Sequence, residues 1–177
     1  MSRYVSYWLV PAMAPRSFLQ ECIATLAQVH QAPFFVPHVT IYSGESPLGE
    51  DPLEIIDQSL RGVQQVTLQV QSILSADAFT KTLFLQFYPS EVLSRVTEQM
   101  RRISAKPSPY VLDPHLSLLY KHMDAQDKRA LAATIRLPTS PVLFDAVWAI
   151  AADGIPRTAE DVLGWEVVCV RRLGEAL

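Results

Sequence analysis

Hydrophobic and polar residues repeat with two different periods along this chain, and these periods predict a mixture of strands and helices. Between residues 63 and 74, valine and leucine alternate with glutamine, which is typical of a strand with one buried face. Shorter apolar runs that end at Pro, Gly or Ser predict the remaining strands. The expected strands span residues 4–11, 36–43, 63–74, 82–87, 112–120, 142–152 and 165–171.

Apolar residues at helical spacing predict helices between these strands. Asp51, Ser90 and Asp124 precede three of them and are expected to cap their N-termini. The expected helices span residues 15–29, 52–60, 91–103 and 125–135, with inward stripes that include Phe18, Cys22, Leu26 and Val29 in the first and Val92, Val96, Met100 and Ile103 in the third. Together with the strands, these helices predict an α+β fold.

Two tripeptides within the apolar strands carry candidate chemistry. His38-Val39-Thr40 and His115-Leu116-Ser117 each place a hydroxyl residue two positions after a histidine. In a strand, residues i and i+2 point to the same face, so each tripeptide sets an imidazole beside a hydroxyl. If the two faces came together, they would supply two proton-transfer groups and two hydrogen-bonding hydroxyls, which suits phosphoester chemistry.

The order of the predicted elements repeats along the chain. Each His-x-hydroxyl strand follows a helix and precedes another helix and further strands, and the two histidines are 77 residues apart. This rhythm suggests a duplicated α+β unit that folds as two facing lobes. The connections are short, so we expect residues 1–177 to form a single bilobal domain.

Composition narrows the class of protein. Hydrophobic residues make up 49% of the chain, but no apolar run approaches the length that crosses a membrane, and the N-terminus lacks the order of a signal peptide. A cytoplasmic protein without a membrane partner is therefore expected. The net charge is −3 and no run of Lys and Arg exceeds two residues, so a small phosphorylated substrate is favoured over long nucleic acid.

Neither cofactor nor metal is expected from the motifs. Cys22 and Cys169 lie in apolar segments and are expected to be free thiols, with a regulatory disulfide as the alternative. No spacing of Cys and His resembles a zinc site, and six glycines include no glycine-rich phosphate loop.

With proline before each histidine, the two tripeptides match both signatures of the two-histidine phosphoesterase superfamily. The chain resembles its cyclic phosphodiesterases, typified by the plant enzyme, and Trp8, Tyr110 and Trp165 add to the likeness. The resemblance implies two antiparallel sheets that face a central water-filled cleft, with helices on the outside. It also implies hydrolysis of nucleoside 2′,3′-cyclic phosphates to 2′-phosphates, or of ADP-ribose 1″,2″-cyclic phosphate, which is left over from tRNA splicing.

Roles follow for particular residues. We assign His38 as general acid and His115 as general base, although the sequence leaves the order of the two open. Thr40 and Ser117 would hydrogen bond to the non-bridging phosphate oxygens. The remaining candidates around the substrate are Trp8 or Tyr7, stacked on base or ribose, Tyr120 at the cleft mouth, and Lys81 as a mobile cationic lip, while Trp165 and Tyr110 are expected to pack in the core.

Two alternatives stay open. One is the RNA-end branch of the same superfamily, with 2′,3′-cyclic phosphodiesterase or 2′–5′ RNA ligase-like activity on tRNA halves or oligonucleotides. The other is a binding protein without catalysis that recognises a nucleotide phosphate in the same cleft. A monomer is expected in each case.

Overall fold

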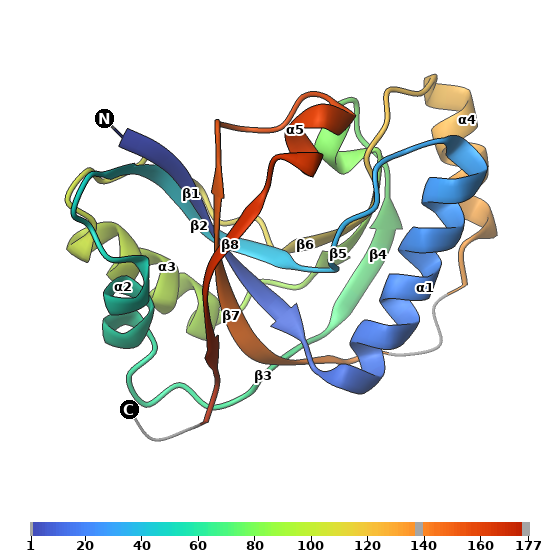
Figure 1. The fold of residues 1–177 in the computed structure, drawn as a ribbon. Coiled ribbons are helices and arrows are strands. Elements are labelled where there is room, and N and C mark those ends of the chain that lie inside the picture. The colour runs from blue at the N-terminus through green and yellow to red at the C-terminus, as the bar shows by residue number, and fades with distance from the viewer. Residues whose placement is uncertain (1, 137–139, 175–177) are drawn as a thin grey trace.

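In the computed structural model, which describes residues 2–136 and 140–174, the strands form one antiparallel sheet with helices outside it (Figure 1). Within these residues the sheet has eight strands in the order β3-β7-β1-β2-β6-β5-β4, with β8 beside β7. The α+β class and the external helices are confirmed. The strands are β1 (Ser2–Pro11), β2 (Val39–Pro47), β3 (Val66–Leu68), β4 (Val70–Leu74), β5 (Leu83–Phe87), β6 (His115–Leu119), β7 (Val142–Ala152) and β8 (Glu166–Arg172).

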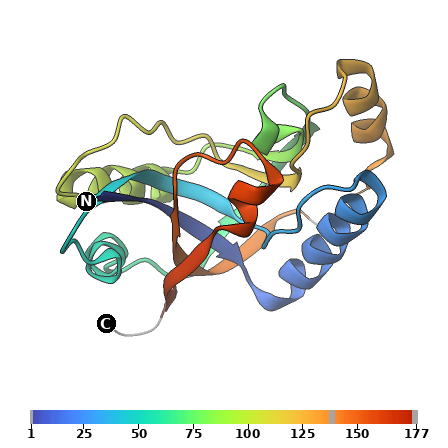
Figure 2. The same cartoon turned by 45° about the horizontal axis from the view of Figure 1, so that its top comes forward.

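The helices lie in two groups at opposite sides of the sheet. Figure 1 shows α1 and α4 at one side and α2 and α3 at the other, while Figure 2 shows α5 on the segment that joins β7 to β8. The helices are α1 (Met13–His30), α2 (Pro52–Ser59), α3 (Glu91–Ile103), α4 (Ala125–Thr134) and α5 (Ala159–Leu163), and a short 3-10 helix, η1, spans Phe79–Lys81. No helix in the described part of the chain is long and apolar enough to cross a membrane.

The two halves of the chain repeat one pattern of elements, and their strands share one sheet because β7 of the second half pairs with β1 and β3 of the first. The series β1-α1-β2-α2-β3 corresponds to β5-α3-β6-α4-β7, as the duplicated motif predicts. Strand β2 of the first half pairs with β6 of the second through Val39 and Leu116. The two expected antiparallel sheets are therefore joined edge to edge into one continuous sheet.

The segment 66–74, predicted as one strand, divides at Gln69 and closes the sheet. Its first part, β3, pairs with β7, whereas its second part, β4, pairs with β5 at the other end of the strand order. The backbone carbonyl of Gln69 accepts a hydrogen bond from Tyr88 N (3.0 Å). This bond helps to fix the point at which the segment changes its pairing strand. The two ends of the sheet are linked by the chain itself.

Local signals placed several helix ends correctly. The side chain of Asp51 accepts a hydrogen bond from Leu53 N (2.9 Å), and that of Ser90 accepts one from Leu93 N (3.4 Å). Asp124 is the N-cap residue of α4, but its side chain makes no capping bond. Helix α5 was not predicted, although Thr158 and Asp161 form a capping box at its start.

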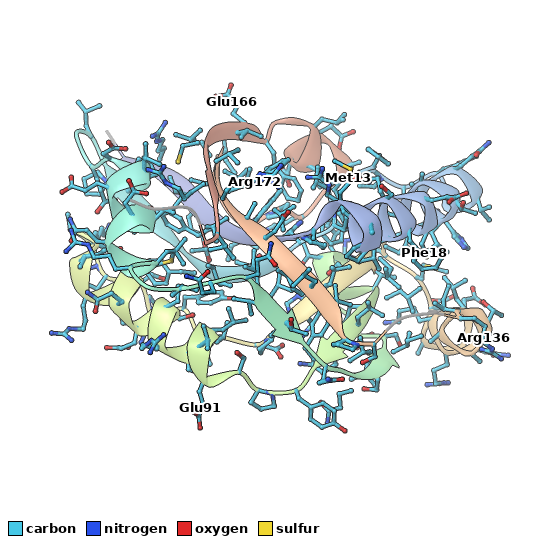
Figure 3. The ribbon with its side chains drawn as sticks, turned by 90° about the horizontal axis from the view of Figure 1, so that it is seen from below. Met13, Phe18, Glu91, Arg136, Glu166 and Arg172 are labelled. Carbon is cyan, nitrogen blue, oxygen red and sulfur yellow. The ribbon has the colours of Figure 1, made fainter. Side chains whose placement is uncertain are left out.

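Other predictions were wrong by one or a few residues. Strand β2 begins at Val39 rather than at residue 36, and it continues beyond the predicted end at residue 43 to Pro47. Helix α1 buries Leu19, Ile23, Leu26 and Ala27, so Phe18 and Val29 are exposed instead of inward; Figure 3 labels Phe18 and Met13 on this helix. In α3 the buried face is Leu93, Val96, Thr97 and Met100, and Val92 is exposed.

Both cysteines are free thiols, as expected. Cys22 on α1 and Cys169 on β8 are each half-buried.

Candidate active site

A cleft of about 530 Å³ lies where the two halves of the sheet meet. Its walls contain the site candidates predicted from the sequence, with the exception of Tyr7, and they come from β1, β2, β6, η1 and the segments next to them. These candidates are His38, Thr40, His115, Ser117, Tyr120, Trp8 and Lys81. The tertiary structure thus brings the two tripeptides together in one cavity.

The pairing of Val39 with Leu116 explains how the tripeptides meet. In an antiparallel pair, the residues on either side of a matched position lie opposite one another in reverse order. His38 therefore lies across from Ser117, and Thr40 lies across from His115. Val39 and Leu116 are fully buried on the other face, so their four neighbours point into the cleft.

His38 is held by its own backbone and by an aromatic ring. Nδ1 lies 2.6 Å from the carbonyl oxygen of Val36, which can only accept, so Nδ1 carries the proton and Nε2 is the basic nitrogen. The imidazole stacks on Trp8 with ring centroids 3.6 Å apart and planes 7° from parallel. Burial lowers the pKa of His38 from 6.5 to about 3, so the ring is neutral near pH 7.

His115 repeats this arrangement in the second half. Nδ1 donates to the carbonyl oxygen of Asp113 at 2.7 Å, which again leaves Nε2 free of a proton. Burial is the largest cause that lowers the pKa of His115 below 6.5, and the charge of Lys81 adds to it. The carboxylate of Asp113 opposes this shift from 3.8 Å.

The two hydroxyls differ in their freedom to bind a ligand. The Ser117 hydroxyl donates to the carbonyl oxygen of Thr80 at 2.6 Å, so its one proton already has an acceptor within the protein. Thr40 is anchored through its backbone, whose carbonyl oxygen accepts a hydrogen bond from the Tyr110 hydroxyl (2.8 Å). The side chain of Thr40 remains at the cleft surface.

The remaining candidates lie in the cleft with contacts that were not expected. His38 covers one face of the Trp8 ring, and Trp8 is only 4% exposed. Trp8 therefore packs against the histidine and leaves little surface on which a nucleobase could stack. Tyr120 is 4% exposed and stacks on Phe35 with ring centroids 3.9 Å apart, which places it in the cleft wall. Tyr7 is buried in the core, so the alternative prediction that Tyr7 stacks on the base or ribose was wrong.

Lys81 is ordered by two contacts. Its ammonium group lies 2.6 Å from the carboxylate of Asp113 and 4.4 Å from the centre of the Phe84 ring. The same carboxylate accepts a hydrogen bond from Gln86 (2.9 Å). The positive charge of Lys81 is therefore already paired with a carboxylate at the cleft wall.

Trp165 and Tyr110 pack against the hydrophobic core, as the sequence predicts, but both also line the cleft, which was not expected. The Trp165 ring packs edge to face against Trp8, with ring centroids 4.9 Å apart. It thus adds a third ring to the stacked pair of Trp8 and His38. Thr80 and Asp113 were not singled out at all. Asp113 carried a signal, because Asp113-Pro114-His115 and Val36-Pro37-His38 place a carbonyl at the same offset from each histidine.

Among the described residues, no group of three or more His, Cys, Asp and Glu side chains is arranged to hold a metal ion. The cleft offers two imidazoles, several hydroxyls and two lysines that are paired with carboxylates. This set can bind an anion, accept a proton and donate a proton without rearrangement of the backbone.

Comparisons with known proteins identify the family of this chain. The family model described as "Cyclic phosphodiesterase-like protein" matches residues 1–173. The chain is 28% identical over 154 residues to a 2′,3′-cyclic-nucleotide 3′-phosphodiesterase of Phaeosphaeria nodorum, covering 76% of this chain and 78% of the relative. It is 22% identical over 126 residues to the cyclic phosphodiesterase of Arabidopsis thaliana, covering 70% and 68%.

A solved structure has the same fold. The crystal structure of E. coli LigT complexed with 3′-AMP superposes with a TM-score of 0.61 over 99% of this chain and 100% of that chain, at 15% sequence identity. This likeness concerns the fold alone.

Proposed function

The chain belongs to the cyclic phosphodiesterase-like family, and from this premise we propose that it hydrolyses nucleotide cyclic phosphates with His38 and His115 as an acid–base pair. The observation that carries the proposal is the Val39–Leu116 pairing, which sets each histidine across from the hydroxyl residue of the other motif. The substrates would be nucleoside 2′,3′-cyclic phosphates, ADP-ribose 1″,2″-cyclic phosphate, or both.

The reaction needs two proton transfers at one phosphorus atom. A water molecule attacks phosphorus while the base removes its proton, the bond from phosphorus to the 3′ oxygen breaks, and the acid gives a proton to that oxygen. The product is a 2′-phosphate with a free 3′ hydroxyl. The name of the fungal relative refers to this 3′ ester, which supports the same regiochemistry here.

The geometry suits in-line attack on a strained five-membered ring. One histidine stands on each half of the sheet, so base and acid can lie on opposite sides of phosphorus. Thr40 and Ser117 lie between them and could hydrogen bond to the non-bridging oxygens, where charge grows in the transition state. Because Ser117 donates to Thr80 in the free protein, it must change its partner when it donates to the substrate.

Proton supply is linked to substrate binding. Both imidazoles have pKa values below 6.5 in the free protein, and that of His38 is about 3. A bound phosphate anion stabilises an imidazolium, so the proton that the acid needs is taken up as the substrate binds. Proton uptake on binding can serve either histidine, and we keep the assignment of His38 as acid and His115 as base as a proposal.

The order of the two roles can be tested with a substrate in which sulfur replaces the 3′ oxygen. A thiolate leaves without a proton because its pKa is about 8.5, far below that of an alcohol. If His38 is the acid, His38→Gln should hydrolyse the sulfur substrate much better than the oxygen substrate, whereas His115→Gln should be slow with both. The reverse pattern would exchange the roles.

A small substrate is favoured over long RNA. The two lysines in the cleft wall both face carboxylates, Lys81 at 2.6 Å from Asp113 and Lys106 at 2.5 Å from Glu45. A polyanion would therefore find little unpaired positive charge along this wall. Equal turnover of a mononucleotide cyclic phosphate and of an oligonucleotide that ends in one would contradict this preference.

The function is tested by product analysis with several cyclic phosphates, in the presence and absence of a chelator. We expect 2′-phosphate as the product, the same rate with chelator, and no turnover of 3′,5′-cyclic AMP, whose six-membered ring does not place the leaving oxygen as the five-membered ring does. Tight binding of a 2′-phosphate without hydrolysis of any cyclic phosphate would instead favour a binding protein.

A further inference from the structure

The cleft extends well beyond the histidines along β1. Trp8, Ser6 and Tyr4 occupy alternate positions of this strand, and all three line the cavity. At about 3.3 Å per residue, Tyr4 lies about 13 Å from Trp8 along the strand. A phosphate between the histidines would therefore fill one end of the cavity and leave the other end for the rest of the substrate.

A β-bulge turns the polar side chains of β2 into this far end. Trp8 pairs with Thr40 and Tyr7 pairs with Tyr42, so Ile41 is an extra residue in β2. Because of this extra residue, Thr40 and Ser43 both face the cleft although they are three positions apart. The bulge thus continues the polar floor of the phosphate site.

The floor ends in a pair of hydroxyls. Tyr4 donates a hydrogen bond to the Ser43 hydroxyl at 2.9 Å, and Ser43 is 7% exposed. The pair uses one of its two hydroxyl protons, so a proton and several lone pairs remain for a ligand. Hydroxyl groups rotate, and they can therefore meet either a donor or an acceptor.

A rigid proline segment forms the wall beside β2. Ser108 N donates to the Tyr42 hydroxyl at 2.8 Å, and Gly44 lies so close to Ser108 that an added Cβ would be 2.7 Å from the serine Cβ. These contacts fix the prolines on either side of Ser108, which line the cleft. Figure 2 shows this segment, between α3 and β6, passing alongside β2.

The opposite wall follows β7, which pairs with β1 on the side away from β2. It continues through Gly154 to Ile155 and Pro156, which also line the cavity. Ile155 is 67% exposed, so its side chain is free to contact a ligand. A flat apolar ligand between the two walls would cover it.

We propose that this part of the cleft, a slot formed by Tyr4, Ser43, Pro107, Ile155 and Pro156, binds the nucleobase of the substrate. The faces of the ring would lie against the proline and isoleucine walls, and its polar edge would meet the Tyr4–Ser43 hydroxyls. The slot ends where Lys106 reaches across to Glu45, the register partner of Tyr4, so its length suits one nucleoside. The inference rests on the proposed function and names the part of the substrate that the site recognises.

The hydroxyl floor has a consequence for specificity. Since the groups of the floor can donate or accept, they do not select one pattern of donors and acceptors on the base edge. We expect purine and pyrimidine substrates to be hydrolysed with similar kcat/KM. The base should add binding affinity without a preference for one base over another.

The test compares adenosine 2′,3′-cyclic phosphate with methyl riboside 2,3-cyclic phosphate, which has no base. We expect kcat/KM to favour the nucleotide at least about tenfold, mainly through KM. Ile155→Ser should reduce this preference about tenfold, and Ser43→Ala severalfold. Leu163→Ser, which removes another exposed aliphatic residue from the same β7–β8 segment outside the cleft, is the matched control and should keep the full preference.

Equal kcat/KM for the two probes, or an unchanged preference in Ile155→Ser, would overturn the slot while leaving the hydrolysis intact. If neither probe is hydrolysed, the proposed hydrolysis of nucleoside 2′,3′-cyclic phosphates fails, and calorimetry then tests the slot by itself. Adenosine 2′-phosphate should bind at least about tenfold more tightly than inorganic phosphate, and Ile155→Ser should abolish that difference. Equal binding of the two ligands would overturn the slot.

Discussion

The orientation of each histidine is set by the residue two positions before it. The carbonyl oxygens of Val36 and Asp113 accept the Nδ1 protons of His38 and His115, and a proline follows each carbonyl. Proline favours an extended residue before it, which turns that carbonyl beside the imidazole. Both rings therefore present the basic Nε2 nitrogen, the one that can exchange a proton with the substrate.

The paired histidines predict loss of activity from either single substitution. His38→Gln and His115→Gln should each lower kcat by about 10²–10⁴-fold, because each removes one of the two proton-transfer groups. Steady-state kinetics with a 2′,3′-cyclic mononucleotide measures the loss. His30→Gln, outside the cleft, is the matched control. Retained activity in either cleft variant would rule out the two-histidine mechanism.

The lowered pKa values predict an acidic optimum for kcat/KM. The active form of the free protein holds one proton on the pair, so kcat/KM is largest between the two pKa values. The pKa of His38 is about 3 and that of His115 lies below 6.5, which places the maximum below pH 6.5. The measurement is kcat/KM from pH 4 to 9, and a maximum above pH 7 would contradict the lowered pKa values.

At the scale of elements, the loop of residues 76–81 connects a buried lysine to the cleft. Lys128 on α4 is 4% exposed, and its ammonium group donates to the Ala76 carbonyl oxygen (2.9 Å) and pairs with Asp77. Farther along this loop, the carbonyl oxygen of Thr80 accepts a hydrogen bond from the Ser117 hydroxyl, and the ammonium group of Lys81 pairs with the Asp113 carboxylate. Helix α4 thus holds the loop that closes one side of the cleft.

Replacement of this lysine should loosen the loop. Lys128→Met keeps the length of the side chain but removes the hydrogen bond to Ala76, so the free energy of unfolding should fall by about 1–3 kcal/mol. KM should rise as well, because Thr80 and Lys81 lose their support. Urea denaturation and steady-state kinetics measure the two effects.

The control for this substitution is Asp77→Asn. The Asp77 side chain is 98% exposed, so its ion pair with Lys128 is expected to add little. If Asp77→Asn destabilised the protein as much as Lys128→Met, the ion pair rather than the carbonyl bond would hold the loop.

At the scale of the whole molecule, the site lies at the junction of the two halves. One residue pair joins β2 to β6, while the segment 66–74 links the outer strands of the sheet. The histidines next to this junction are screened from water by both halves together. Their burial is thus a property of the assembled sheet, and unfolding would expose them.

Stability should therefore depend on pH through His38. Its pKa is about 3 in the folded protein and 6.5 for an exposed side chain, so the unfolded chain binds more protons between these values. The free energy of unfolding should fall as pH drops below 6.5, by at most about 1.4 kcal/mol per pH unit for this group. Urea denaturation at pH 7 and pH 5 measures the slope.

His38→Gln should reduce this pH dependence, whereas His30→Gln should leave it unchanged. His115 acts in the same direction, since its pKa is also lowered, so part of the slope will remain in the single variant. The same slope in His38→Gln as in the original protein would show that the imidazole is not buried in solution.

Local sequence patterns were sufficient to predict several elements. They were insufficient where pairing or packing with a distant segment decides the structure. The predicted range of β7, residues 142–152, is the observed one, and the caps at Asp51 and Ser90 form as expected. The division at Gln69 was missed because alternation continues through it, and only the choice of pairing partner changes there. The position of Phe18 was missed because Leu19, its neighbour, is equally apolar and the packed sheet selects between them.

The sequence by itself determined the fold class, the duplicated order of elements and the two His-x-hydroxyl tripeptides, because these depend on short-range periodicity and residue type. The tertiary structure alone decided that the tripeptides face each other through Val39 and Leu116, that Trp8 supports His38, and that Trp165 and Tyr110 line the cleft. Such contacts join residues far apart in the chain, and local pattern carries no information about which distant surfaces will meet.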